Sequence, residues 1–226
     1  MADALTYIGN KYSLDLHARH LPIEIPNTDR ESLARLFYLL GFSTGAEIGV
    51  ERALYSEVLL RENPLLHLTC VDAWQAYRGY RDHVDQGKLD RFFVEAQERL
   101  KPYASRVTFR RQFSAAAAAE IPDRSLDCVY IDAAHDLASV VADLAMWSKK
   151  VRIGGIVAGH DYVKAKLPSL MHVPQAIHAW TDAYQIAPWF VLGSKAKVDG
   201  ERRDDGRSWF YVVPEPVSSG RRPIKQ

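Results

Sequence analysis

Hydrophobic residues recur at helical spacing in residues 27–41. Thr28 and Glu31 have the spacing of a capping box at the start of this segment, and Gly41 follows its last apolar position. The apolar stripe along one face consists of Leu33, Leu36, Phe37 and Leu40. The pattern therefore predicts an amphipathic helix that ends at Gly41.

From residue 45 onward, short apolar segments alternate with helical ones. The strand-like segments are residues 45–50, 66–72, 107–110, 126–132 and 154–159, and the helical segments are residues 54–61, 89–103, 115–119 and 137–147. This alternation favours right-handed βαβ crossovers and a parallel sheet, in which ligands bind outside the carboxyl ends of the strands. We therefore predict a Rossmann-like α/β fold with helices on both faces of a mostly parallel sheet.

The end of the chain does not follow this alternation of strands and helices. Residues 189–193 and 208–213 are aromatic-rich strands, and the charged loop between them has no room for a crossover helix. They are therefore expected to pair as an antiparallel hairpin. The predicted organisation is an N-terminal extension (1–26), one domain (27–215) and a flexible tail (216–226).

Charge and composition narrow the partner classes. The 226 residues include 29 Lys and Arg against 28 Asp and Glu, a formal net charge of +1. This balance provides no overall field for phosphates or anionic lipid, so neither nucleic acid nor a membrane is the expected partner. The N-terminus lacks the basic and apolar regions of a signal peptide, which predicts a cytoplasmic protein. Cys70 and Cys128 lie far apart in apolar segments and are expected to be buried thiols.

A candidate ligand loop follows the first strand of the alternating series. Gly49 lies between this strand and a helix, where the missing side chain lets the backbone approach a ligand. Arg52 and Ala53 replace further glycines of a GxGxxG motif, which disfavours NAD. Asp72 ends the next strand 23 residues after Gly49, the separation at which such folds place a carboxylate that accepts bonds from both hydroxyls of a ribose.

Four segments within residues 45–162 resemble successive motifs of the class I S-adenosylmethionine (SAM)-dependent methyltransferases: AEIGVERALYS, TCVDAW, VYIDAAHD and GGIVAGHDY. They are most similar to a branch with Asp after the fourth strand and His-Asp-Tyr after the fifth. Several relatives in that branch methylate hydroxyls of sugars or natural products. The resemblance implies a seven-stranded sheet with an antiparallel last strand, SAM as cofactor, and methyl transfer to a hydroxyl of a small molecule.

The resemblance also assigns contacts to the cofactor. Asp72 takes the ribose hydroxyls. Phe113 stacks on the adenine, Ser114 bonds its edge, and Trp74 packs on its other face. The remaining cofactor residues are Glu47, Gly49, Tyr55 and Ser56 at the methionine end, Gln112 beside the adenine, and Asp132.

Polar residues after the fourth and fifth strands are expected to meet at one rim of the sheet: Asp132, His135, Asp136, His160 and Asp161. Removal of a hydroxyl proton needs a base because a neutral alcohol is a poor nucleophile. His135 and His160 are the candidate bases, with Asp132 beside them, and Asp136 or Asp161 would orient the imidazole. Tyr162 and His135 are the candidate contacts to the acceptor.

Similar O-methyltransferases hold Mg²⁺ at this rim, and their ligands map to Asp132, His160 and Asp161. A hard cation prefers oxygen ligands. The imidazole of His160 therefore favours a softer divalent metal, or none.

Two other functions stay open. A metal-dependent hydrolase would also use an Asp and His cluster, but hydrolysis does not require the combination of Glu47, Gly49 and Asp72. A non-catalytic SAM-binding subunit would keep the fold and bind a partner. The segment before Asn27 would cap either the active site or a second subunit of a homo-oligomer.

Overall fold

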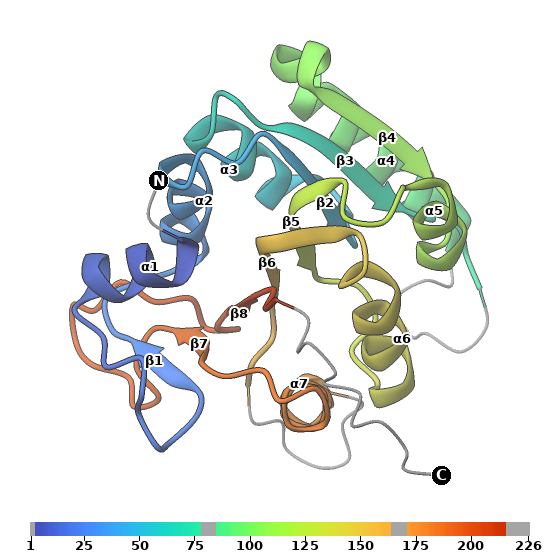
Figure 1. Cartoon of the computed structure of the whole chain (residues 1–226). Coiled ribbons are helices and arrows are strands. Elements are labelled where there is room, and N and C mark those ends of the chain that lie inside the picture. Colours follow the sequence, from blue (N-terminus) through green and yellow to red (C-terminus); the bar gives the residue numbers. More distant parts are fainter. Residues whose placement is uncertain (1–2, 78–84, 164–170, 216–226) are drawn as a thin grey trace, which may run out of the picture.

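The computed structural model describes residues 3–77, 85–163 and 171–215. Its strands form one eight-stranded sheet in the order β1-β7-β8-β6-β5-β2-β3-β4 (Figure 1). Every pairing is parallel except those of β8 with β6 and with β7. One C-terminal strand therefore runs against all the others, and the predicted Rossmann-like α/β fold is confirmed.

The elements follow the predicted alternation. The strands are β1 (Ile23–Ile25), β2 (Thr44–Ile48), β3 (His67–Asp72), β4 (Val107–Arg111), β5 (Leu126–Ile131), β6 (Val151–Gly159), β7 (Trp189–Leu192) and β8 (Trp209–Val212). The helices are α1 (Ala4–Tyr12), α2 (Arg30–Leu39), α3 (Leu54–Glu62), α4 (Gln86–Leu100), the 3-10 helix η1 (Lys101–Arg106), α5 (Ser114–Glu120), α6 (Leu137–Trp147) and α7 (Val173–Ala183).

The N-terminal segment belongs to the sheet, although residues 1–26 were expected to lie outside the domain. β1 pairs in parallel with β7, with Ile23 opposite Phe190 and Ile25 opposite Leu192. Ile8 of α1 is fully buried in the same core. The expected seven strands thus become eight. A strand of three residues is too short to show a period of two, so the pattern could not reveal it.

Both residues of the capping box at α2 differ from the predicted pair, because the box joins Asp29 to Ser32 and not Thr28 to Glu31. Asp29, not Thr28, is the N-cap, and its carboxylate accepts the backbone N–H of Ser32 at 2.8 Å. Thr28 instead donates its hydroxyl to the carbonyl of Ile25 at 2.5 Å, which ties β1 to the start of the helix. Both side chains are acceptors that suit a cap, and tertiary contacts decide between them.

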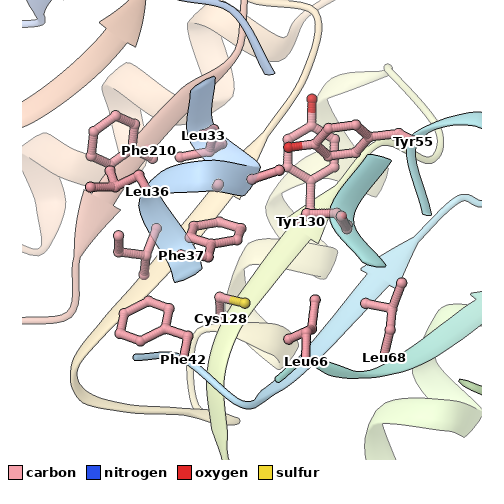
Figure 2. Packing of buried hydrophobic residues seen from close by; sticks show 14 of the residues in the cluster. Leu33, Leu36, Phe37, Phe42, Tyr55, Leu66, Leu68, Cys128, Tyr130 and Phe210 are labelled. Atoms are coloured by element: carbon pink, nitrogen blue, oxygen red, sulfur yellow. The ribbon is translucent and has the colours of Figure 1, made fainter. Parts of the chain in front are cut away.

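Two hydrophobic layers enclose the sheet. One layer packs the sheet against α1, α2, α3 and α4, and the other packs it against α5, α6 and α7 (Figure 1). Along β5, Cys128 and Tyr130 face the first layer, whereas Val129 and Ile131 face the second. Figure 2 shows part of the first layer, in which the ring of Tyr55 lies 4.3 Å from that of Tyr130, centre to centre. Cys70 and Cys128 are buried free thiols, as predicted.

The strand order reverses beside β2. From β2 the chain continues outward to β3 and β4, and it then returns to β5 on the other side of β2. Ligands of such sheets bind outside the carboxyl ends of the strands at this switch point. The loops after β2 and β5 are therefore the place to look for a site.

The predicted tail, residues 216–226, lies outside the described residues. Among the residues that are described, no helix combines the length and apolar character needed to cross a membrane.

Candidate active site

A cavity of about 740 Å³ opens at the switch point. This volume lies in the range of roughly 300–1,000 Å³ that is usual for small-molecule sites. The predicted site residues that line it are Glu47, Gly49, Tyr55, Asp72, Gln112, Phe113, Ser114, Asp132, His135 and His160. The predicted residues outside its lining are Ser56, Trp74, Asp161 and Tyr162.

Gly49 makes the close contact between the two switch-point loops. Its φ is +86°, and an added Cβ would lie 2.1 Å from the carbonyl oxygen of Asp132 and 2.7 Å from the Cα of Ala133. These are backbone atoms that cannot swing away. Glycine is therefore required here by the neighbouring loop, in addition to any ligand.

Asp72 is tied to the loop after β2. Its Oδ2 accepts the backbone N–H groups of Val50 at 3.0 Å and Glu51 at 2.9 Å, and its Oδ1 accepts that of Trp74 at 2.8 Å. A carboxylate offers about four lone-pair positions, and three are already used. The structure leaves room for one further hydrogen bond, whereas the sequence predicted two from a ribose.

Glu47 and Ser56 form a buried pair between β2 and α3. Glu47 is 2% exposed, and the hydroxyl of Ser56 donates a short hydrogen bond to its carboxylate. Burial raises the pKa of Glu47 to about 8, although the bond from Ser56 opposes that shift. Ser56 therefore supports Glu47 from the far side of the cavity wall, and Glu47 itself reaches the cavity.

Trp74 is a core residue in this structure. Its side chain is fully buried, its ring packs 4.6 Å from that of Phe93, and its indole N–H donates to the carbonyl of Glu51 at 2.7 Å. Trp74 therefore lies in the core and outside the cavity lining, unlike the ring expected to face an adenine. Its position directly after Asp72 gave no indication of which way the ring turns.

Ser114 has its hydroxyl engaged within the protein. It donates to Asp143 of α6 at 2.5 Å and accepts the indole N–H of Trp147 at 2.8 Å. Phe113, by contrast, is 45% exposed, and its ring meets that of Tyr77 edge to face. The predicted aromatic platform is thus available, whereas the predicted hydroxyl contact is already taken.

Asp132, His135, His160 and Asp161 meet after β5 and β6, and we call them the rim cluster. Ladder bonds place them: Asp132 donates its backbone N–H to Ile48, and His160 donates its own to Ile131. His135 Nε2 lies 2.9 Å from Asp161 Oδ2 and 3.8 Å from Asp132 Oδ1. His160 Nδ1 lies 3.5 Å from Asp161 Oδ1 and 3.8 Å from Asp132 Oδ2. Asp136, the fifth predicted rim residue, instead caps α6 by accepting the N–H of Ser139.

The charges of the rim cluster stabilise one another. Burial alone would lower the pKa of His135, but the hydrogen bonds and charges of Asp132 and Asp161 outweigh it and raise the pKa to about 9. Burial would likewise raise the pKa of Asp161, yet the two imidazoles hold it well below its usual range. Carboxylates and imidazoles therefore form one electrostatic unit.

The metal-ligand geometry differs from the predicted set. Ligand atoms of Asp132, His135 and Asp161 all lie within 4.8 Å of one another, so His135 takes the place expected for His160. His135 follows Asp132 by three residues in the loop before α6, and that loop turns its ring toward Asp161. The spacing of these residues in the sequence did not indicate that the ring of His135 lies toward Asp161.

Tyr162 points away from the cavity. Its hydroxyl lies 2.8 Å from His178 Nε2, and its ring meets Trp189 edge to face, while the guanidinium of Arg207 lies over it. These contacts hold Tyr162 outside the cavity lining, and its role in acceptor binding stays a prediction. The backbone after β6 is instead fixed by the loop before β8, where Gly206 accepts the N–H of Asp161.

Sequence reasoning missed several residues of the cavity wall: Arg30, Lys88, Phe92, Asp143 and Met146. Asp143 carried a detectable signal. It lies three residues after Val140 and four before Trp147, so a carboxylate occupies the inward stripe of an apolar helix. A charge in such a position is costly unless it has a purpose or a partner.

The switch-point cavity, the acid at the end of β3 and the single antiparallel strand together define a Rossmann-like enzyme of the class I methyltransferase type. Residues 44–162, more than half of the chain, match the model of a family described as a methyltransferase domain. The chain belongs to this methyltransferase family, and the resemblance seen in the sequence is confirmed. No curated protein is similar enough in sequence to count as a match.

Solved structures share the fold at low identity. An O-methyltransferase from Bacillus cereus in complex with SAH is 15% identical, with a TM-score of 0.59 over 92% of this chain and 88% of that one. TomG from Streptomyces achromogenes, an O-methyltransferase of tomaymycin synthesis in complex with SAM, is 17% identical, with a TM-score of 0.57 over 94% and 91%. The N-methyltransferase NodS from Bradyrhizobium japonicum is 15% identical, with a TM-score of 0.54 over 82% and 95%. These likenesses establish the fold, and they include both oxygen and nitrogen methyltransferases.

Proposed function

We propose that this protein is a SAM-dependent methyltransferase that transfers a methyl group to a hydroxyl of a small molecule. The observation that carries the proposal is one continuous cavity, whose lining includes Glu47, Gly49 and Asp72 together with three members of the rim cluster, Asp132, His135 and His160. The family supports methyl transfer, and similar structures in complex with SAM or SAH (S-adenosylhomocysteine) support the cofactor.

The residues present fit SAM. Gly49 leaves the backbone after β2 uncovered, Asp72 keeps one acceptor position for a ribose hydroxyl, and Phe113 offers an exposed ring for stacking. Glu47 lines the cavity, its carboxyl interacts electrostatically with Asp132 of the rim cluster, and we assign it to the methionine end. When bound, SAM supplies an electrophilic methyl group on a sulfonium.

At the rim, the residues of the protein must hold the acceptor oxygen and accept its proton. Asp132, His135 and His160 line the cavity, whereas Asp161 lies behind them. His135 Nε2 is turned to Asp161 at 2.9 Å, which suits a positioning role. We assign proton uptake from the hydroxyl to Asp132 with His160, whose Nδ1 lies 3.8 Å from the Asp132 carboxylate.

A divalent metal also fits the rim cluster. Asp132, His135 and Asp161 would hold it, and two oxygens with one nitrogen favour Mn²⁺, Fe²⁺ or Zn²⁺ over Mg²⁺. Such an ion would lower the pKa of a bound hydroxyl. Activity that EDTA abolishes and Mn²⁺ restores would assign this role, and activity unchanged by EDTA would assign proton uptake to the side chains alone.

The test begins with calorimetric titration of SAM and SAH into the parent protein, Asp72→Asn and Asp72→Ala. Asn keeps one oxygen for the N–H groups of Val50 and Glu51, but it turns an NH₂ toward the N–H of Trp74 and loses the charge, so binding should fall about 10-fold, and Ala should weaken it further. Asp182→Asn, an exposed change on α7 outside the cavity lining, is the matched control and should bind as the parent does.

Transfer is then measured as SAH release with a panel of hydroxylated small molecules, for the parent and for Asp132→Asn. Binding of SAM together with turnover that Asp132→Asn lowers about 100-fold would establish the proposal. Absence of SAM and SAH binding would reject it in favour of a metal-dependent hydrolase, and SAM binding without transfer to any hydroxyl would favour a non-catalytic subunit or a nitrogen acceptor.

A further inference from the structure

Arg30 is a cation of the cavity wall that comes from outside the central part of the sheet. It is the first residue of α2, and it lines the cavity together with Tyr55. Its backbone is held at both polar groups, because the N–H donates to Asp204 Oδ2 at 2.7 Å and the carbonyl accepts the hydroxyl of Tyr55 at 2.9 Å. The guanidinium carbon lies 5.4 Å from the centre of the Tyr55 ring. The side chain therefore extends from a fixed backbone position.

The loop before β8 places Arg30 beside the rim cluster. Asp204, which holds Arg30, is two residues from Gly206, a span of at most about 7 Å. A Cβ at Gly206 would lie 2.6 Å from His160 Cε1, so this loop lies directly against the rim cluster. Arg30 also interacts electrostatically with Asp132. The cation therefore borders the part of the cavity to which proton uptake is assigned.

The guanidinium of Arg30 has hydrogen-bond donors that the described residues do not use. Arginine offers several N–H donors in a planar fork. The ion pair with Asp204 is long, with 3.9 Å between Nε and Oδ1, and the side chain of Arg30 is 37% exposed. The other arginine of the described cavity lining, Arg52, is already bound by Glu95 at 2.5 Å. Arg30 is therefore the arginine of this lining that can bind an anion.

A carboxylate is the anion that suits this arrangement. The guanidinium fork matches the two oxygens of a carboxylate in a bidentate pair. One cation balances one negative charge, whereas a phosphate with two charges would leave excess negative charge beside Asp132. Leu54, which is half exposed, lines the same cavity and supplies apolar surface for the rest of a small molecule.

We propose that the methyl acceptor is a small hydroxy acid whose carboxylate is bound by Arg30, and that Asp204 is a positioning residue for this arginine. The inference rests on the proposed function and names the substrate class of the same cavity. Binding of the carboxylate fixes one end of the acceptor, so that its hydroxyl is held at the rim cluster. The selecting residues come from the start of α2 and the loop before β8, both outside the residues 44–162 that match the methyltransferase family.

The test compares acids with their amides on the protein saturated with SAH. Meta- and para-hydroxybenzoate and their neutral primary amides are titrated by calorimetry at neutral pH, where the acids are ionised. The parent should bind at least one acid about 10-fold more tightly than its amide, the usual effect of a charge-assisted hydrogen bond. Arg30→Gln should abolish this preference. Arg30→Lys keeps the charge but loses the fork, so it should retain part of the preference.

Arg35→Gln is the matched control and should keep the preference of the parent. Arg35 lies on the same helix, outside the cavity lining, and pairs with Glu62 at 2.9 Å. Asp204→Asn keeps an oxygen for the backbone N–H of Arg30 but loses the charge, so it should reduce the preference for the acid about threefold. A merely structural role of Asp204 would weaken acid and amide alike, and the ratio of the two affinities separates these cases.

Methylthioadenosine, which lacks the amino-acid end of SAH, distinguishes an acceptor carboxylate from that of the cofactor. Weaker binding of SAH but not of methylthioadenosine by Arg30→Gln would assign the guanidinium to the cofactor and overturn the inference. Equal binding of acids and amides by the parent would also overturn it, as would tighter binding of para-hydroxyphenyl phosphate than of para-hydroxybenzoate. SAH binding and transfer to a neutral hydroxyl compound would survive each of these results, whereas failure of the parent to bind SAH would reject the proposed function as well.

Discussion

Two parts of the cavity are held in place by different kinds of contact. The loop end, which consists of Gly49, Val50, Glu51 and Asp72, is fixed by backbone groups: Asp72 accepts three backbone N–H bonds, and Gly49 lies against the backbone of the loop after β5. In the rim cluster, ladder bonds place the backbone, but the functional side chains are held by one another, through contacts of 2.9 to 3.8 Å between carboxylates and imidazoles.

This difference separates what the fold requires from what the chemistry requires. Backbone contacts at the loop end depend on the strand order, and they suit a cofactor that is shared by many enzymes. Side chains of the rim cluster can be exchanged without moving a strand, so under the proposed function they are residues that would set the acceptor.

The largest expected effect comes from Gly49→Ala, which breaks the loop end. A Cβ at φ +86° would collide with the carbonyl oxygen of Asp132 at 2.1 Å. Positive φ and overpacking against backbone together should cost about 4 kcal/mol. Urea denaturation would measure this loss, and calorimetry should detect no SAH binding.

Gly41→Ala is the matched control for Gly49→Ala. Gly41 also has a positive φ, of +72°, but no atom lies within 4 Å of the added Cβ. It should lose about 1 kcal/mol and keep SAH binding. Equal losses in the two variants would show that the contact between the two loops is unimportant.

The sequence was sufficient for the fold wherever long apolar segments carried a clear period. The helix α2, the central strands and the hairpin of β7 and β8 were predicted because their core faces repeat over four or more residues. It was insufficient for β1, because three residues carry no detectable period. The predicted N-cap of α2 was also wrong. Thr28 and Asp29 are both good N-cap residues, and only the bond of Thr28 to Ile25 distinguishes them.

The sequence predicted at which strand end each site residue lies, but it did not predict the direction in which the side chain points. Parallel strands bring their carboxyl ends to one edge, so Gly49, Asp72 and Asp132 were placed correctly. Trp74 and Tyr162 were placed at the right strand ends, yet both rings turn into packed layers. Their direction depends on residues far away in sequence, such as Phe109 and Trp189, which no local pattern encodes.

Glu47→Gln should change how stability depends on pH. Burial raises the pKa of Glu47 to about 8, well above its ordinary value near 4.5, so the folded protein keeps a proton that the unfolded chain releases. The stability contributed by this proton is complete below about pH 4.5 and is lost as pH rises through 8, at up to about 1.4 kcal/mol per unit.

Urea denaturation from pH 5 to pH 8 should therefore show the parent losing about 3 kcal/mol relative to Glu47→Gln. Gln keeps an oxygen for the hydroxyl of Ser56, so the variant should fold. Parallel curves for the two proteins would mean that Glu47 is already ionised in the folded state, with a charged partner inside the cavity wall.

Asp161→Asn should break the rim cluster and spare the loop end. The residue has a φ of +58°, a conformation that Asn tolerates, so the backbone should persist. Loss of the charge removes the nearer of the two carboxylates from both imidazoles, and turnover should fall about 100-fold while the Kd for SAH changes less than about threefold. A fall in SAH affinity as large as the fall in turnover would contradict the division between the two parts of the cavity.

Trp74→Phe has the smallest expected effect and addresses how the core supports the loop end. The substitution removes the N–H that holds the carbonyl of Glu51 at 2.7 Å, and it leaves the packing on Phe93 largely in place. Unfolding free energy should fall by about 1 kcal/mol, and the Kd for SAH should stay within about twofold of the parent. Trp189→Phe, a buried indole outside the cavity lining, controls for the loss of ring volume. A loss of SAH affinity well beyond twofold and confined to Trp74→Phe would show that the indole N–H supports ligand binding through the loop that contains Glu51.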